Sequence, residues 1–529
     1  MPLRPLYTIE WLGEDRAILV TRPARWLPER GNEDLMGRRS EAVGARQART
    51  TTVVAVLALC GTVVSLQQTL VVPLLPDLPR MLHTAPDNAS WLVTATLVAG
   101  AVAIPTLSRL ADMYGKKRMM LVAITVMVAG SVLGAVTSAL PLLITARALQ
   151  GVGVALIPIG IAIMRDELPP ERLPLGVAVM SATLAIGSGA GLPLVGLTVE
   201  HLDWHSIFWI TGAAGAVMSV AVAMVVPESP LRSAGRFDYA GALMLSGAIT
   251  GLMIAITKGA HWGWLSWPTL TLASAGIALL VVWFPLELRN RSPLVDLRVS
   301  ARPAVLLVNI ASVLTGFAMY ANMLVTTQIL QQPTVTGYGL GFDIFHTGLW
   351  LAPTAVVFGA MAPVAAATIR LLGPQITLLT GAVGMGVSYV VRIFLSHDLW
   401  QIELGSVLVG VGTSLTFAAM PNLIMRAVPE SETASANGLN TVLRSVGTST
   451  SSAALAAIAT AVVIRIGDRA YPSFSAFATV FWIAAAASFV AGLLVLPLLR
   501  MREGPDTTAA DIVVSERVLH GDPLPVQTG

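Results

Sequence analysis

Apolar segments of about 20 residues recur along this chain, and a helix of that length crosses the ~30 Å hydrocarbon core of a bilayer. Hydrophobic residues make up 55% of the 529 residues and charged residues only 12%, which no soluble core of this size requires. The sequence therefore predicts an all-α polytopic membrane protein. Its fourteen predicted spans lie near 51–72, 90–109, 119–138, 141–164, 175–199, 206–227, 239–257, 268–286, 303–325, 347–369, 375–395, 400–425, 436–464 and 474–500.

Lys and Arg are unevenly distributed among the connecting loops, and cytoplasmic loops retain positive charge. With the N-terminus inside, about 26 of the 33 fall on the cytoplasmic side, and the outer side holds Arg80, Lys258, Arg465 and Arg469. This predicts a plasma-membrane protein with both termini in the cytoplasm. Tryptophans favour the membrane interface, and those at predicted outer ends agree: Trp91, Trp204, Trp262, Trp264, Trp267, Trp350 and Trp400.

Three arginines, Arg147, Arg392 and Arg444, lie inside predicted spans, and the same spans hold one clearly embedded carboxylate, Glu403. A charge in the hydrocarbon region costs a few kcal/mol or more, so it usually faces a cavity or a partner. This pattern predicts a transport path inside a helix bundle. We expect Arg392 and Glu403, on either side of the turn 396–401, to pair across a helical hairpin and to serve mainly structure.

The ends of the chain are polar. Residues 1–50 hold nine arginines among mixed acids and are predicted to be a cytoplasmic tail, with Met36 as an alternative start; residues 501–529 are predicted to be a second cytoplasmic tail. The single Cys60 excludes a disulfide within the chain and is expected to pack in the core. The net charge of +3 follows from loop arginines, so no nucleic-acid partner is inferred. No metal site is predicted.

Two short motifs recur along the chain. GVG at Gly151–Gly153 returns at Gly410–Gly412, 259 positions later, and IMR at Ile163–Arg165 returns at Ile424–Arg426, 261 positions later. Repeats are common in transporters because two bundles rock around one central site. An offset of eight spans, where two six-helix halves would give six, predicts an extra helix pair between the halves. The predicted parts are a six-helix bundle over 51–230, a two-helix insertion over 231–300 and a second six-helix bundle over 301–500.

The connection after the second span, SRLADMYGKKRMML, matches the pattern GxLaDrxGrkxxl with Ser108 in place of the first glycine, and the fourth span, LLITARALQGVGVALIPIG, is similar to lxxxRxxqGxgaa. On these motifs the chain resembles the major facilitator superfamily, specifically its fourteen-span drug:proton antiporter branch, from about 51 to 500. The resemblance implies the major facilitator fold, with the two extra helices central. It also implies a cytoplasmic gate, formed by Asp112, Gly115, Lys116, Lys117 and Arg118. The alternative for these residues is a positive-inside anchor only.

The fourth-span motif keeps Arg147, Gln150, Gly151 and Gly153. The resemblance ties this arginine to proton transfer, and because an arginine stays charged it would have to tune or organise a neighbouring titrating group. The alternative is a structural arginine bonded to backbone carbonyls. A weaker likeness, NTVLRSVG in the thirteenth span, adds Arg444 to this predicted coupling core.

The fifth span, GSGAGLPLVGL, resembles the antiporter pattern gxxxGPxxGG in altered form. Gly187, Gly191 and Gly196 are kept, whereas the proline has moved to Pro193. The altered motif predicts a bent, thin helix. By resemblance it favours export over import.

One departure concerns the first span, where the family usually has an aspartate and this chain has Gln67, followed by Gln68 and Thr69. A glutamine side chain cannot titrate, so this position carries no proton. With Arg147 and Arg444 deep in the membrane, we expect a positive cavity that prefers anionic or neutral amphiphiles. The predicted cavity residues are polar or aromatic positions of inward-facing spans: Gln67, Gln68, Thr69, Trp91, Thr94, Asn309, Tyr320, Asn322 and Asn440.

Together these features predict a secondary active transporter that exports small amphiphilic compounds in exchange for protons by alternating access, as a monomer in the lipid bilayer. The proton gradient is the expected energy source, and no cofactor is predicted. Uniport or symport of a metabolite or lipid remains the alternative. A membrane enzyme or sensor would require a catalytic constellation or a soluble output domain, and neither is found, nor is a GxxxxGK[ST] nucleotide loop.

Overall fold

The computed structural model describes residues 7–11, 17–21, 50–71, 74, 78–290, 292–396 and 398–500. The chain divides into two compact units, Met1–Val53 and Val54–Gly529. In the first unit, β1 (Tyr7–Trp11) pairs antiparallel with β2 (Ala17–Thr21), a hairpin that the sequence did not predict. The alternative start Met36 and the tail 501–529 lie outside the described residues.

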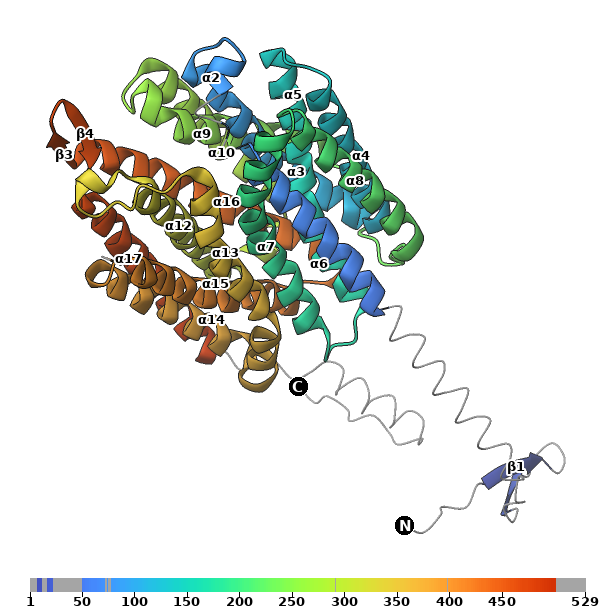
Figure 1. Ribbon diagram of the computed structural model, residues 1–529. Helices are drawn as coiled ribbons and strands as arrows, with labels where there is room; N and C mark the ends of the chain where they lie inside the picture. Colours follow the sequence, from blue (N-terminus) through green and yellow to red (C-terminus); the bar gives the residue numbers. More distant parts are fainter. Residues whose placement is uncertain are drawn as a thin grey trace. The chain divides into compact units, whose positions relative to one another are not determined.

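Long helices make up almost all of the second unit (Figure 1). The first helix, Thr50–Thr69, is followed by α2 (Leu78–Met81), α3 (Pro86–Tyr114), α4 (Lys116–Ala135), α5 (Leu140–Gly151), η2 (Val152–Ala155), α6 (Leu156–Glu167), α7 (Leu173–His201), α8 (Ser206–Val225), α9 (Tyr239–Trp262), α10 (Trp267–Arg289) and α11 (Leu297–Ser300). The remaining elements are α12 (Pro303–Gln331), η3 (Thr334–Thr336), α13 (Ile344–Ala360), α14 (Ala362–Phe394), α15 (Leu399–Ala427), η4 (Glu430–Glu432), α16 (Thr433–Ala461), β3 (Val463–Ile466), β4 (Arg469–Pro472) and α17 (Phe474–Arg500).

Twelve helices in the described part are long and apolar enough to cross a membrane. One of these stretches, Phe345–Phe394, holds 50 residues and is interrupted at Gly373, whose backbone (φ 85°, ψ 159°) is not helical, so it contains two spans. The more polar α16 is 29 residues long, about 43 Å at the rise of an α-helix. These helices are compatible with the fourteen predicted spans.

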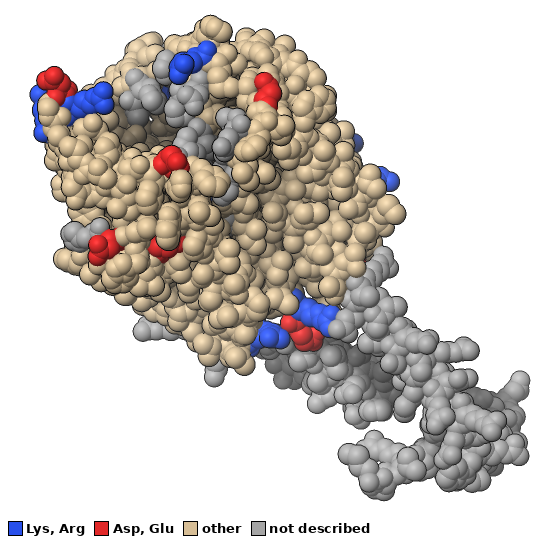
Figure 2. Space-filling model, in the orientation of Figure 1, with Lys and Arg blue, Asp and Glu red and all other residues tan. Residues whose placement is uncertain are grey.

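The surface fits a bilayer. On the face shown in Figure 2, most of the described surface carries no Lys, Arg, Asp or Glu, and these residues gather in a few patches. Large apolar side chains such as Leu371, Met224 and Leu243 are more than three-quarters exposed. An exposed apolar surface of this extent marks a protein or membrane contact. In this protein, the membrane lipid covers it.

Helix ends are set by local chemistry. Asp238 caps α9 and Asp343 caps α13, each with its carboxylate accepting a backbone N–H of the first turn. At the start of α15, Asp398 and Gln401 form a reciprocal capping box. Between α3 and α4 the chain turns at Gly115 (φ 119°), where a Cβ would lie 2.7 Å from a carboxylate oxygen of Glu228. Only glycine fits this turn.

The sequence repeat corresponds to a repeat in space. In the first half (residues 54–225), a Cβ added at Gly153 would lie 2.8 Å from the sulfur of Met127. In the second half (residues 303–500), a Cβ added at Gly412 would lie 2.5 Å from Cγ of Met385. Met385 stands 258 positions after Met127, close to the 259 that separate the glycines. The two GVG segments therefore pack on corresponding neighbours.

Helices α9 and α10 connect the halves. α9 packs against α3 of the first half and α16 of the second, and α10 packs against α9. Lys258, expected in an outer loop, lies instead within α9 and is buried; its Nζ is 2.5 Å from Oγ of Ser90 and 4.7 Å from the ring centroid of Trp91. The charge pattern missed this because a hydroxyl and an indole face can hold a lysine inside a bundle.

Candidate functional site

One end of the bundle joins the two halves by hydrogen bonds. We call the end where α3 meets α4 the Asp112 end, and the opposite end, where α3 begins, the Trp91 end. Asp112 is fully buried, and its carboxylate accepts hydrogen bonds from the backbone N–H groups of Ala434 (3.2 Å) and Ser435 (2.8 Å) and from the Ser435 hydroxyl (2.7 Å). The unpaired N–H groups at the start of α16 are thus capped by a carboxylate from the other half.

Two further contacts join the halves. Arg165 of α6 donates to the Val428 carbonyl (3.2 Å), the Pro429 carbonyl (3.3 Å) and the Thr433 hydroxyl (2.6 Å). The Ser181 hydroxyl of α7 donates to the carbonyl of Phe417 in α15 at 3.0 Å. These three groups, Asp112, Arg165 and Ser181, lie toward the Asp112 end. The halves are therefore hydrogen-bonded to each other at that end.

The other predicted gate residues bond to the first half and to Glu228, which follows α8. Nζ of Lys116 forms a 2.6 Å ion pair with Asp166, and both side chains are buried. The backbone N–H groups of Lys117 and Arg118 donate to Glu228 at 3.2 and 3.3 Å. The motif does not identify these acceptors, because Asp166 and Glu228 lie about 50 and 110 positions further along the chain.

Ser108, which departs from the motif glycine, faces α16. Its hydroxyl is buried and has no hydrogen-bond partner among the described residues, and a Cβ added at Gly438 would lie 2.7 Å from it. The glycine that allows α3 and α16 to approach is therefore on α16 in this chain. This compensation joins positions 330 apart, so motif comparison along one segment could not reveal it.

Arg147 of α5 is buried and tethers three helices. Its Nε donates to the carbonyl of Leu92 (3.2 Å), and its Nη1 donates to the carbonyl of Gln67 (3.2 Å) and to Oε1 of Gln150 (2.8 Å). Gln150 in turn donates to the Ser131 hydroxyl of α4 at 2.9 Å. This is the geometry of a structural arginine bonded to backbone carbonyls, and its part in proton coupling stays a prediction.

Arg392 of α14 is held by side chains. Its Nη1 donates to Oδ1 of Asn322 and its Nη2 to the Thr326 hydroxyl (2.9 Å), both on α12, and its guanidinium lies 4.5 Å from the ring centroid of Phe481. The Asn322 amide donates to the Ser406 hydroxyl of α15 at 3.0 Å. Asn322, predicted to line the substrate cavity, is engaged in this network.

Glu403 joins the same network from the other side. Oε1 of Glu403 is 3.3 Å from the hydroxyl of Thr354 in α13, and that hydroxyl is 3.0 Å from Oγ of Ser406. No ion pair within 4 Å links Glu403 to Arg392, both of which the structure describes, so the expected pairing across the hairpin is wrong. The two charges are connected through Thr354, Ser406 and Asn322 instead.

Arg444 of α16 has a different environment. Its guanidinium lies 4.8 Å from the ring centroid of Phe417, and it donates no hydrogen bond and forms no ion pair to any of the described residues. It is half-buried although it lies within a membrane helix. A Cβ added at Gly316 of α12 would lie 2.9 Å from its Cγ, so its stem packs between α12 and α15.

The other predicted cavity residues are distributed among several roles. Asn440 donates to Asn309 at 3.0 Å and joins α16 to α12, while the hydroxyls of Thr69 and Thr94 bond carbonyls of their own helices. Gln67 is buried, and its Oε1 has no hydrogen-bond partner in the part of the chain that the structure describes. Half-buried positions are Gln68, Trp91 and Tyr320. Their contact with a substrate stays a prediction.

Glycines of the altered antiporter motif bring α7 close to the first helix. A Cβ added at Gly187 would lie 2.4 Å from the carbonyl oxygen of Thr62, and one at Gly191 would lie 2.2 Å from the hydroxyl of Thr69. The helix α7 continues from Leu173 to His201. The side chain of Pro193 and the surroundings of Gly196 lie outside what the structure describes.

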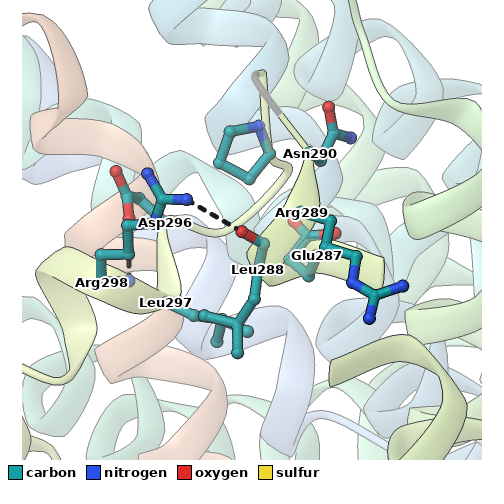
Figure 3. Close-up of a pocket in the computed structure, with 8 residues that line it drawn as sticks. Glu287, Leu288, Arg289, Asn290, Asp296, Leu297 and Arg298 are labelled. Carbon is teal, nitrogen blue, oxygen red and sulfur yellow. Dashed lines mark hydrogen bonds between the residues drawn. The ribbon is translucent and has the colours of Figure 1, made fainter. Parts of the chain in front are cut away.

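A cavity of about 260 Å³ lies at the Asp112 end, between the end of α10 and α11, and Figure 3 shows the residues that line it. Arg298 donates to the Leu288 carbonyl at 3.1 Å, and Glu287 accepts the backbone N–H of Val295 at 2.8 Å. All lining residues fall within 287–298, so this cavity belongs to the connection after the insertion and does not lie between the two halves.

Comparison with known proteins agrees with this architecture. Residues 57–452 and 310–519 match the sequence profile of the Major Facilitator Superfamily. The multidrug resistance protein Stp of Mycobacterium tuberculosis (strain CDC 1551 / Oshkosh) is 29% identical over 391 residues, 73% of this chain and 71% of that protein. The tetracenomycin C resistance and export protein of Streptomyces glaucescens is 25% identical over 409 residues, 77% of this chain and 74% of that protein.

A further relative is the putative multidrug resistance protein MdtD of Salmonella paratyphi B, 28% identical over 382 residues, 71% of this chain and 79% of that protein. Among solved structures, the human organic anion transporter MFSD10 superposes with a TM-score of 0.61 and 14% identity, covering 84% of this chain and 99% of that one, which shows the same fold. The predicted all-α fold is thereby confirmed. The chain belongs to the major facilitator superfamily.

Proposed function

We propose that this protein exports small amphiphilic compounds across the plasma membrane in exchange for protons, as a monomer with both termini and the Asp112 end in the cytoplasm. Relatives named for multidrug resistance and for tetracenomycin C export support the class of substrate. The observation that carries the proposal is the cap that Asp112 places on α16, because it joins the two halves at one end through few, separable hydrogen bonds.

Alternating access follows from this contact. Opening the Asp112 end requires Asp112 to leave the start of α16 and Arg165 to leave Thr433 and its neighbours. Hydrogen bonds that involve a charged group contribute roughly 1.5–3 kcal/mol each. A handful of them is strong enough to favour the joined state and weak enough to be exchanged for contacts at the Trp91 end during a transport cycle.

Proton exchange requires a titrating group, and Gln67 cannot supply it. Glu403 is our candidate, since it is a carboxylate within a span that bonds Thr354 of α13 rather than a fixed cation. Arg392 of α14 is the charged group that acts on it from the helices packed against α15 in the described structure. Protonation of Glu403 would weaken its attraction to Arg392 and loosen the link between α13 and α15.

The test uses purified protein in proteoliposomes with an acidic lumen and a pH-sensitive dye inside. Addition of a transported compound is expected to make the lumen more alkaline in the wild type. Glu403→Gln is expected to abolish this proton movement, while Glu171→Gln, which removes an exposed carboxylate between α6 and α7, leaves it unchanged. Substrate movement without proton movement in the wild type would instead support uniport or symport, the alternative that Gln67 favours.

A further inference from the structure

Arg444 differs from the other two arginines of the membrane interior because none of the described residues is its polar partner. Arg147 donates to three oxygen atoms and Arg392 to two, with an additional aromatic ring beside the latter. Arg444 has only the ring of Phe417, and no charged group of the described structure acts on it.

The direction of the side chain places it inside the second half. Its stem lies against Gly316 of α12, and its guanidinium lies against Phe417 of α15, so it is held between two neighbours of α16 and directed away from lipid. Phe417 is itself fully buried and is anchored by Phe358, whose ring meets it edge-on at 6.3 Å. Arg444 remains half-buried, and its guanidinium nitrogens are not among the fully buried polar atoms of the described structure, so they keep some accessible surface.

The charge of Arg444 at this position requires a compensating partner. Arginine stays charged in a protein, and a charge within the membrane costs a few kcal/mol or more unless something compensates it. The aromatic contact supplies roughly 0.5–2 kcal/mol. It satisfies none of the five N–H donors of the guanidinium, which match the oxygens of carboxylate, sulfonate or phosphate groups.

We propose that Arg444 binds the anionic group of the transported amphiphile, which makes oxyanions such as carboxylates, sulfonates and phosphates the preferred substrate class. This inference rests on the proposed export function. Phe417 holds the planar guanidinium at a fixed angle, leaving its donors directed at the incoming oxyanion. Arg147 contributes to the positive potential of the interior, but it is fully buried and its Nε and Nη1 already donate to three oxygen atoms, so it does not compete for the anion.

Two probes with the same rings separate charge from shape: 8-anilinonaphthalene-1-sulfonate, and N-phenyl-1-naphthylamine, which lacks the sulfonate. Equilibrium dialysis against protein in phosphatidylcholine nanodiscs, with empty nanodiscs subtracted, measures the affinity for each. The wild type is expected to prefer the sulfonate. Arg444→Gln is expected to weaken sulfonate binding roughly tenfold to a hundredfold, the value of a charge-assisted hydrogen-bonded pair, and to change binding of the uncharged probe less than about twofold.

Matched variants refine the result. Arg444→Lys keeps the charge without the planar fork and is expected to lie between wild type and Arg444→Gln. Arg370→Gln removes an exposed arginine from α14 and is expected to retain full sulfonate preference. Retained binding of N-phenyl-1-naphthylamine by Arg444→Gln shows that the variant is folded. If the variant does not fold, the sulfonate preference of the wild type and the affinity of Arg444→Lys still test whether Arg444 binds the anion.

The site could receive its oxyanion from a soluble compound or from an acidic lipid headgroup. Replacing part of the phosphatidylcholine with phosphatidylglycerol distinguishes them: a lipid source would reduce sulfonate binding to the wild type and not to Arg444→Gln. Equal wild-type affinity for both probes, absence of binding of either, or unchanged sulfonate preference in Arg444→Gln would each overturn the inference. None of these results depends on proton movement, so a wild type that binds the sulfonate without exporting it would contradict the proposed function alone.

Discussion

The two halves of the transporter hold corresponding polar networks in which an arginine and a serine have exchanged helices. In the first half, Arg147 of α5 is linked to Ser131 of α4 through one amide side chain; in the second, Arg392 of α14 is linked to Ser406 of α15 in the same way. Ser406 stands 259 positions after Arg147 and Arg392 stands 261 after Ser131, the offsets of the two sequence repeats. The guanidinium is kept in each half, but from the opposite helix.

The partners of the two arginines differ in kind. Arg147 bonds backbone carbonyls, whose hydrogen-bonding capacity does not change with pH. Arg392 bonds side chains, and its network continues to Glu403, whose counterpart 259 positions earlier is the apolar Ile144. The first half therefore contains a fixed tether, while the second contains a network that protonation can alter. We therefore place the proposed proton coupling in the second half.

Removal of Arg147 should have the largest effect. Arg147→Gln leaves the carbonyls of Leu92 and Gln67 without their buried donor, and breaking a buried charged contact costs about 3–5 kcal/mol. We expect a large loss of folded protein, measured as the melting temperature in detergent and the monodisperse yield. Arg370→Gln is the control for loss of one exposed positive charge. A melting temperature of Arg147→Gln close to that of the control would show that the first-half network is no tether.

Corresponding threonines test the contrast between the halves directly. Thr354 bonds Glu403 and Ser406, whereas Thr96, 258 positions earlier, bonds only the carbonyls of Leu92 and Arg147. Thr354→Val removes a donor from the ionised carboxylate, so the acid limb of transport should move to higher pH by roughly 0.5–1 unit, from a hydrogen bond of about 1 kcal/mol.

Thr96→Val is expected to leave that pH profile in place and to lower only the melting temperature. The measurement for both variants is the rate of substrate-dependent proton movement in proteoliposomes as a function of pH. Equal shifts in the two variants would remove the distinction between a fixed first half and a titrating second half.

A smaller effect is expected at the interface between the halves. Gly438→Ala would bring a methyl group against the Ser108 hydroxyl, and overpacking of this kind costs about 1–3 kcal/mol. The joined state at the Asp112 end should lose population. A cysteine introduced at Ala436, in a Cys60→Ala background, should then react faster with a soluble maleimide. Adding Ser108→Gly should restore the slow rate, and failure to restore it would contradict the steric explanation.

Much of this architecture follows from features that are local in sequence. The spans follow from runs of apolar residues, the turn at Gly115 follows from its motif, and the GVG repeat anticipates the corresponding helix contacts. Each of these features depends on residues within a few helical turns of one another or on a motif that occurs twice in the sequence. The major facilitator fold could therefore be predicted before any helix was placed.

The candidate site depends on contacts between distant segments. Arg392 and Arg444 look alike in sequence, yet Arg392 bonds Asn322, whereas Arg444 bonds no polar group of the described residues. The residues that face them lie about 70 and more than 100 positions away along the chain. The same holds for Ser108 and Gly438. Which side chains meet across a helix interface is set by rotation and register of whole helices, and these are not encoded in any one segment.

The smallest effect is expected at Asp343, the cap of α13, which belongs to neither the Arg147 nor the Arg392 network. It shows how large a pH effect is without either network. Hydrogen bonds from the backbone N–H and the imidazole of His346 hold the pKa of Asp343 below its usual range. A carboxylate with a lowered pKa in the folded state contributes stability above its unfolded pKa and loses that contribution as the pH falls through the folded value. Because Asp343 is solvent-exposed, the contribution is screened and small. Asp343→Ala should therefore melt slightly below the wild type at neutral pH and together with it in strong acid. If Asp343→Ala changed the pH dependence of transport as much as Thr354→Val, the cap at the start of α13, and not the Glu403 network, would set the response to pH.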